Sequence, residues 1–173
     1  MKFRSFVAVM LLAGCASSPG SGKLTDRQIA MVMRVMNLSE VREGEIARDK
    51  SGNATVREFA QMIINEHDAQ NNKAEAELLR ADINSEDTTT SRQLDASSGA
   101  AAERLRGLSG AALDRAYIVR EVEAHQAALS VIDASLMPNA RKKVVKEQLT
   151  ALRKLIESHL ARAKKIQASL VSS

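Results

Sequence analysis

Residues 56–67, VREFAQMIINEH, are the stretch on which our interpretation of the fold begins. Apolar side chains recur in it at Val56, Phe59 and Ile63, and the next position of the same series is His67. Apolar residues spaced by three and four form one face of an α-helix. The stretch therefore predicts an amphipathic helix that buries a histidine together with its apolar face.

The same spacing recurs along the chain and predicts four long helices, at residues 26–50, 54–81, 110–136 and 140–170. The other inward positions are Ile29, Met33, Met36, Glu40, Gly44, Ala47, Ala60, Ala74, Leu78, Ile118, Glu121, His125, Leu129, Ile132, Leu136, Val145, Leu149, Leu152, Ile156, His159, Ala163 and Ile166. Strong helix formers are abundant, and aromatic residues make up only 2% of the chain. Four helices with one apolar face each are satisfied by a four-helix bundle, so we expect an all-α fold.

Local signals set the ends of these helices. Thr25 supplies an N-cap signal for the first helix, and Asn139 is predicted to cap the fourth. Pro138 is expected to close the third helix because proline does not continue a helix. Between the second and third helices, residues 82–92 are predicted to form a polar loop and residues 93–107 a weaker helix.

The connection between the second and third helices decides the topology. It takes roughly 28 residues, which is long for a compact bundle. Such a length can carry the chain back along the bundle, as the long crossover of ferritin-like folds does. We expect this crossover, and a simple up-down-up-down bundle with a floppy insert is the alternative.

The N-terminus resembles the signal of a bacterial lipoprotein. A short positively charged start is followed by an apolar run over residues 6–12, which is far shorter than the about 20 residues that cross a membrane. The run ends in LAGC at residues 12–15, which resembles a lipobox. We therefore predict a signal peptide at residues 1–14, cleaved before Cys15, and a lipid on the thiol of Cys15 that holds the protein to a membrane.

This anchor sets the expected organisation and location. Residues 15–23 are predicted to form a lipidated tether rich in Ser and Gly, and residues 24–171 one four-helix domain. Ala16, rather than Asp, follows the cysteine, which resembles lipoproteins directed to the outer membrane of Gram-negative bacteria. The expected location is the outer membrane, with the domain facing the periplasm and acyl chains such as palmitate in the bilayer.

Charge and composition restrict the partners. The formal net charge is +4, and the loss of Lys2 and Arg4 with the signal leaves about +2, with both signs interspersed. Together with the scarcity of aromatic side chains for base stacking, this predicts that nucleic acid is not a partner. The predicted partner is the membrane, through the lipid. Cys15 is the only cysteine, so its lipidation removes disulfide and thiolate chemistry from the mature protein.

The three histidines of the chain, His67, His125 and His159, all fall on inward stripes, as do Glu40 and Glu121. Imidazole and carboxylate ligands inside a bundle suit Fe, Mn or Zn. At about 1.5 Å per residue, the spread of their levels along the bundle is comparable to side-chain reach, so convergence is allowed. The alternative is that the histidines are interhelical hydrogen-bonding residues of the core, with the two glutamates as partners.

One type of metal centre is excluded by the residues beside the histidines. Di-iron carboxylate bundles use a Glu-x-x-His pair on two of their helices. The residues three positions before the histidines are Ile64, Val122 and Ile156, and none of them can ligate a metal. We therefore expect no carboxylate-rich di-iron centre, and no ferroxidase chemistry of that type.

The spacing of these motifs is similar to that of a bacterial family called domain of unknown function 4142. The motifs that carry the resemblance are residues 40–47, EVREGEIA, residues 56–67, and the segments that end in His125 and His159. The resemblance implies an exported, ferritin-like bundle with Glu40 and the three histidines as polar core positions. This sequence departs from the family at Glu121, where the family more often has an apolar residue.

Function follows from location more than from chemistry. Because no complete catalytic constellation is recognisable, we expect a non-enzymatic, membrane-anchored bundle with a role in the cell envelope or in stress. The alternative is a metal-binding or redox protein built on His67, His125, His159 and Glu40, with Glu121 nearby.

Overall fold

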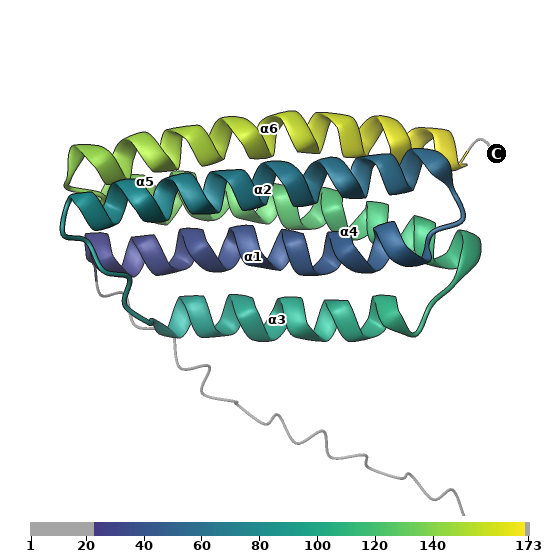
Figure 1. Cartoon of the computed structure of the whole chain (residues 1–173), viewed down its shortest axis with the longest axis horizontal. Coiled ribbons are helices and arrows are strands. Elements are labelled where there is room, and N and C mark those ends of the chain that lie inside the picture. Colours follow the sequence, from purple (N-terminus) through teal and green to yellow (C-terminus); the bar gives the residue numbers. More distant parts are fainter. Residues whose placement is uncertain (1–22, 172–173) are drawn as a thin grey trace, which may run out of the picture.

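The computed structural model describes residues 23–171, and the part of the chain it describes contains helices and no strand. The elements are α1 (Asp26–Lys50), α2 (Ala54–Arg80), α3 (Thr89–Arg106), α4 (Gly110–Val131), the π-helical turn η1 (Ile132–Leu136), α5 (Met137–Asn139) and α6 (Lys143–Val171). Helices α1, α2, α4 and α6 lie side by side as a four-helix bundle (Figure 1). The expected all-α bundle is confirmed.

The long connection carries the chain back along the bundle. Helices α1 and α2 form an antiparallel pair, and α3 with its flanking loops then returns along the bundle, so that α4 starts at the end where α2 started (Figure 1). Helix α4 and helix α6 form the second antiparallel pair. This is the crossover topology of ferritin-like folds. The alternative of an up-down-up-down bundle with a floppy insert is wrong, because α3 is an 18-residue helix packed on α1.

Helix α3 begins earlier than the sequence pattern predicts. Residues 89–92, expected in the loop, already belong to the helix. The side chain of Thr88 accepts a hydrogen bond from the backbone N–H of Ser91, and the Ser91 hydroxyl lies 2.9 Å from the backbone nitrogen of Thr88. This reciprocal capping box satisfies backbone groups at the start of the helix and fixes its first turn.

The junction between the third and fourth bundle helices also differs from the prediction. Pro138 does not end the helical path, which passes through the widened turn η1 and continues to Asn139. Asn139 does not cap α6, because its amide donates to the backbone carbonyl of Ser135. The carboxylate of Asp26 instead accepts hydrogen bonds from the backbone N–H groups of residues 141 and 142, at 2.8 and 3.1 Å. The first turn of α1 thus holds the turn that leads into α6.

The core consists of two apolar clusters separated by a polar layer. One cluster contains Met33 of α1 and Leu149 of α6, and the other contains Phe59 of α2 and Tyr117 of α4. On each bundle helix the residue between the two clusters is polar, and it is one of Glu40, His67, His125 and His159. The predicted inward stripes are buried, except that Leu129 is half-buried and Glu40 keeps 13% of its side chain exposed. The polar layer therefore lies at the middle of the bundle.

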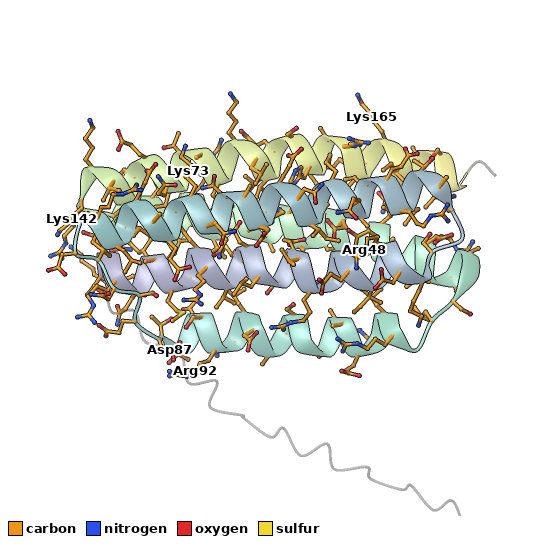
Figure 2. The ribbon with its side chains drawn as sticks, in the orientation of Figure 1. Arg48, Lys73, Asp87, Arg92, Lys142 and Lys165 are labelled. Atoms are coloured by element: carbon orange, nitrogen blue, oxygen red, sulfur yellow. The ribbon has the colours of Figure 1, made fainter. Side chains whose placement is uncertain are left out.

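Charged side chains cover the outside. Lys73 on α2 and Lys165 on α6 are exposed and project from the outer faces of the bundle (Figure 2). Among the described residues, no helix combines the length and the apolar character needed to cross a bilayer. The predicted signal peptide, Cys15 and nearly all of the tether lie outside the described residues.

Candidate metal site

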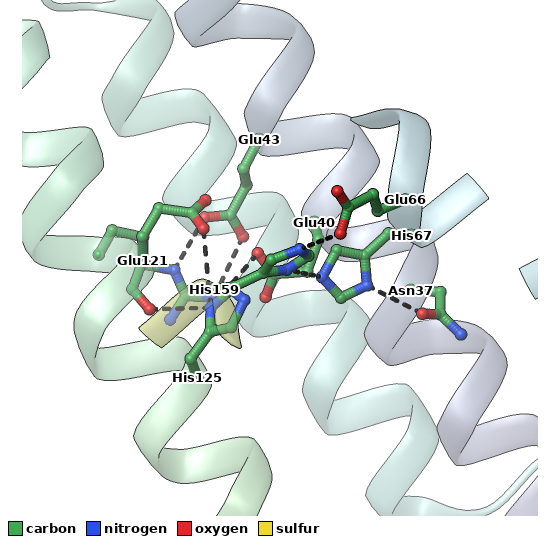
Figure 3. A network of polar contacts seen from close by, with 9 residues as sticks. Asn37, Glu40, Glu43, Glu66, His67, Glu121, His125 and His159 are labelled. Atoms are coloured by element: carbon green, nitrogen blue, oxygen red, sulfur yellow. Dashed lines mark hydrogen bonds and ion pairs between the residues drawn. The ribbon is translucent and has the colours of Figure 1, made fainter. Parts of the chain in front are cut away.

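The three histidines meet at the centre of the bundle. His67 comes from α2, His125 from α4 and His159 from α6 (Figure 3). Their ring centroids lie 5.0 to 5.8 Å apart, and one ring nitrogen from each lies within 4.8 Å of the others. All three side chains are 1% exposed. Three separate stripes thus deliver their imidazoles to one buried point, as three ligands of one metal ion would require.

The tautomer of His67 follows from its neighbour on α1. The Nδ1 atom of His67 lies 2.9 Å from the side-chain oxygen of Asn37. The amide nitrogen of Asn37 donates to the backbone carbonyl of Met33 at 3.1 Å, so the amide oxygen must be the atom that faces His67. His67 therefore carries its proton on Nδ1, and its Nε2 holds a lone pair.

The other two histidines are oriented in the same way by acceptors of their own. The Nε2 atom of His159 lies 2.9 Å from a carboxylate oxygen of Glu66, which accepts its N–H. The Nδ1 atom of His125 lies 2.9 Å from the backbone carbonyl oxygen of Glu121. This leaves lone pairs on Nδ1 of His159 and on Nε2 of His125, and the latter is buried without a hydrogen-bond partner. Histidines that ligate metals generally donate their second ring N–H to such acceptors.

Two of these lone pairs point at one another. Nε2 of His67 and Nδ1 of His159 are 3.2 Å apart. With both protons placed on the opposite sides of the rings, neither nitrogen can donate to the other, and the contact is repulsive unless a cation lies between them. Zinc–nitrogen bonds of about 2.0–2.1 Å at a tetrahedral angle separate two ligand nitrogens by about 3.3–3.4 Å. The observed distance of 3.2 Å between the two nitrogens is close to this separation.

A proton is the other cation that can bridge the pair, and burial opposes it. Burial lowers the pKa of His67 well below 6.5, with the nearby histidines adding to the effect. Burial also lowers the pKa of His159, and it lowers that of His125 to about 3. Neutral imidazoles with free lone pairs are the form that binds metals.

The carboxyl groups of Glu40 and Glu121 lie near Nδ1 of His125. Their carboxylate oxygens lie 3.9 and 3.6 Å from Nδ1 of His125, and these three residues can bring one ligand atom each within 4.8 Å. Burial raises the pKa of Glu40 to about 8 and that of Glu121 well above 4.5. The five predicted residues thus do meet, but they form two groups that share His125.

Reasoning from the sequence missed several residues of this layer. Glu43 is 3% exposed and binds Arg120 through two hydrogen bonds of 2.8 and 3.1 Å, while Ser98 of α3 donates to it at 2.9 Å. Asn37 and Glu43 lie three positions before and after Glu40, so the stripe of α1 already pointed to them. Glu66 is exposed and gave no such signal.

A cavity of about 150 Å³ reaches this layer between α1, α3 and α4. Its lining includes Glu40, His67 and His125, together with Ser98 of α3 and Arg120 of α4. The two groups of ligand atoms therefore border a space that an ion and a few water molecules can enter.

These features define the class: a ferritin-like helical bundle with a cluster of imidazole and carboxyl groups in its core. The chain belongs to the family described as Domain of unknown function (DUF4142), whose model matches residues 13–166. The family predicted from the sequence motifs is confirmed. Among solved structures, the crystal structure of a secreted protein, DUF305, from Streptomyces coelicolor is similar, with a TM-score of 0.70 and 17% identity over 84% of this chain and 93% of that chain. This likeness supports the fold. A search of the curated proteins finds no match.

Proposed function

We propose that this protein is an exported, lipid-anchored helical bundle that binds a transition metal ion through His67, His125 and His159. The observation that carries the proposal is the pair of facing lone pairs on His67 and His159, 3.2 Å apart, in a cluster where each histidine has a protein acceptor for its other N–H. A cation between them converts a repulsive contact into two bonds. Imidazole donors suit Zn²⁺, Fe²⁺ and Cu²⁺.

The non-enzymatic role in the envelope stays a prediction, and it is compatible with metal binding. Three buried nitrogen ligands and a bordering cavity leave room for a fourth, exchangeable ligand. Metal storage, sequestration and redox chemistry all use such a site. The proposal therefore concerns binding of the ion and leaves turnover out.

The test is elemental analysis of protein purified without chelators and then given one equivalent of Zn²⁺. We expect close to one ion per chain in the wild type and none in His67→Ala. Asn65→Ala is the matched control, because Asn65 lies two residues away on the exposed face of α2. Substoichiometric metal in the wild type, or equal metal in His67→Ala, would overturn the proposal.

The lipid anchor is a separate part of the proposal. It is supported by the lipobox-like residues 12–15, and export alone is also supported by the likeness of the fold to that of a protein described as secreted. We expect the wild type to fractionate with outer membranes and Cys15→Ser to accumulate as a full-length precursor that carries no acyl chains. Mass spectrometry of the N-terminal peptide checks this directly, and an unmodified Cys15 in the mature wild type would contradict it.

A further inference from the structure

The carboxyl group of Glu121, beside His125, is buried without a protein partner. Glu121 is 1% exposed, and both of its carboxylate oxygens are buried without a hydrogen-bond partner. The hydroxyl of Tyr117, one turn earlier on α4, is likewise buried and unpartnered. Glu40 lies within ligand distance of the same point. Burying such groups unpaired costs free energy, so their joint placement calls for a compensating group.

The nearby cationic side chain, Arg120, is already paired with another carboxylate. Arg120 is the positive group whose charge acts on both Glu40 and Glu121. Its guanidinium donates two hydrogen bonds to Glu43 instead, and Glu43 is itself buried. Arg120 and Glu43 therefore neutralise each other, and Glu40 and Glu121 are left without a cation of their own.

A cavity next to Glu40 and His125 gives an ion access to these carboxyl groups. The cavity of about 150 Å³ is lined by Glu40 and His125 and is bordered by Ser98 and other small residues of α3 and α4. A hydrated divalent ion that keeps some of its water ligands needs only a few protein oxygens. The side chain of Glu40, 13% exposed, links the buried group to this cavity.

We propose that a second divalent cation, of the kind that prefers oxygen ligands, binds between Glu40 and Glu121, so that His125 stands between two different metal sites. Carboxylates and water suit Mn²⁺ or Mg²⁺, whereas the three imidazoles suit Zn²⁺, which holds nitrogen ligands more tightly than Mn²⁺ does. The Nδ1–H of His125 faces the carboxylate side, and its free Nε2 is left for the histidine cluster. The proposal rests on the proposed function for the first of its two ions.

The experiment loads purified protein with one equivalent of Zn²⁺, removes the excess and titrates Mn²⁺, with free Mn²⁺ followed by electron paramagnetic resonance. We expect one Mn²⁺ per Zn²⁺-loaded wild-type chain. Glu121→Gln should keep its Zn²⁺, which also reports that it folds, and should bind Mn²⁺ at least about tenfold more weakly. Glu40→Gln is a second variant with the same expectation. Glu103→Gln, which neutralises an exposed carboxylate, is the control and should match the wild type.

The outcomes separate the two proposals. If the wild type takes up Zn²⁺ but no Mn²⁺, or if Glu121→Gln binds Mn²⁺ as the wild type does, the second site is overturned and the histidine site stands. If Zn²⁺ is not bound but Mn²⁺ is, and Glu121→Gln abolishes it, the carboxylate site stands and the histidine site is overturned. Binding of neither ion overturns both.

Discussion

The two polar groups on either side of His125 are built in opposite ways. On the histidine side, each ring N–H has an acceptor within 2.9 Å, supplied by Asn37, Glu66 and the backbone of Glu121. On the carboxylate side, Glu121 and Tyr117 have none. The first group is a set of neutral, oriented imidazoles, and the second is a set of buried oxygen atoms without hydrogen-bond partners. The same helical period buries both groups, and their chemistry therefore depends on the side chains that the neighbouring helices place against them.

The largest effect that separates the two sides is expected from Zn²⁺. A ligand present at 1,000 times its Kd stabilises the folded state by about 4 kcal/mol. For a chain of this size, about 4 kcal/mol corresponds to a rise in Tm of roughly 8–16 °C. We expect Zn²⁺ to raise the Tm of the wild type and of Glu121→Gln by this amount and to leave the Tm of His67→Ala unchanged. Thermal unfolding with and without Zn²⁺ measures this. A rise of the same size in His67→Ala would place the zinc outside the histidine cluster.

The second prediction concerns the hydrogen bond that orients the ring of His67. In Asn37→Leu, Nδ1–H of His67 loses its acceptor, and the ring is free to turn its lone pair away from His159. Loss of such an outer partner typically lowers metal affinity by about 10–100-fold. Competition with a chromophoric chelator measures it. Asn71→Leu makes the same change at a buried amide that belongs to α2, and it should leave the affinity for the metal unchanged. Equal affinities in all three proteins would show that Asn37 does not orient the ligand.

Much of this layer follows from the sequence, and the rest depends on packing. The 3.6-residue period placed His67 and its two counterparts inward because each helix buries one face, whatever its neighbours are. The link between His159 and Glu66 joins α6 to α2, and no periodicity reveals which exposed side chain will reach across. Likewise, the division into two groups depends on ring orientation, which the neighbours of His125 set. The early start of α3 escaped prediction because the pair Thr88 and Ser91 was not recognised as a capping box.

In the metal-free protein, we expect the buried carboxyl group of Glu121 to lower the free energy of unfolding. Glu121→Gln removes a buried carboxyl group that has no hydrogen-bond partner and whose ionisation burial opposes, so we expect the free energy of unfolding to rise by about 1–2 kcal/mol at pH 8. Glu43→Gln makes the same chemical change at a carboxylate that is paired with Arg120, and it should lower stability because Arg120 loses its partner. Urea unfolding of the metal-free proteins measures both. Changes of the same sign would contradict the contrast between a paired and an unpaired buried carboxylate.

The smallest expected effect is on the pH dependence of metal-free stability, where the two sides act with opposite sign. The folded-state pKa of His125 is lowered to about 3 from 6.5, so between these values the unfolded chain binds more protons and stability rises with pH. The pKa of Glu40 is raised to about 8 from 4.5, so over that window the folded state binds more protons and stability falls as pH rises. The effect of the histidines fades above pH 6.5 and is nearly gone by about pH 7.5, so we expect the carboxylate effect to dominate there and stability to fall as the pH rises toward 8. Because Glu121 also has a raised pKa, the loss should be shallower in Glu121→Gln, whereas the acid side of the curve, which the histidines govern, should keep its slope. A wild-type curve that stays flat above pH 6.5 would mean that the two carboxylates are compensated in the metal-free protein.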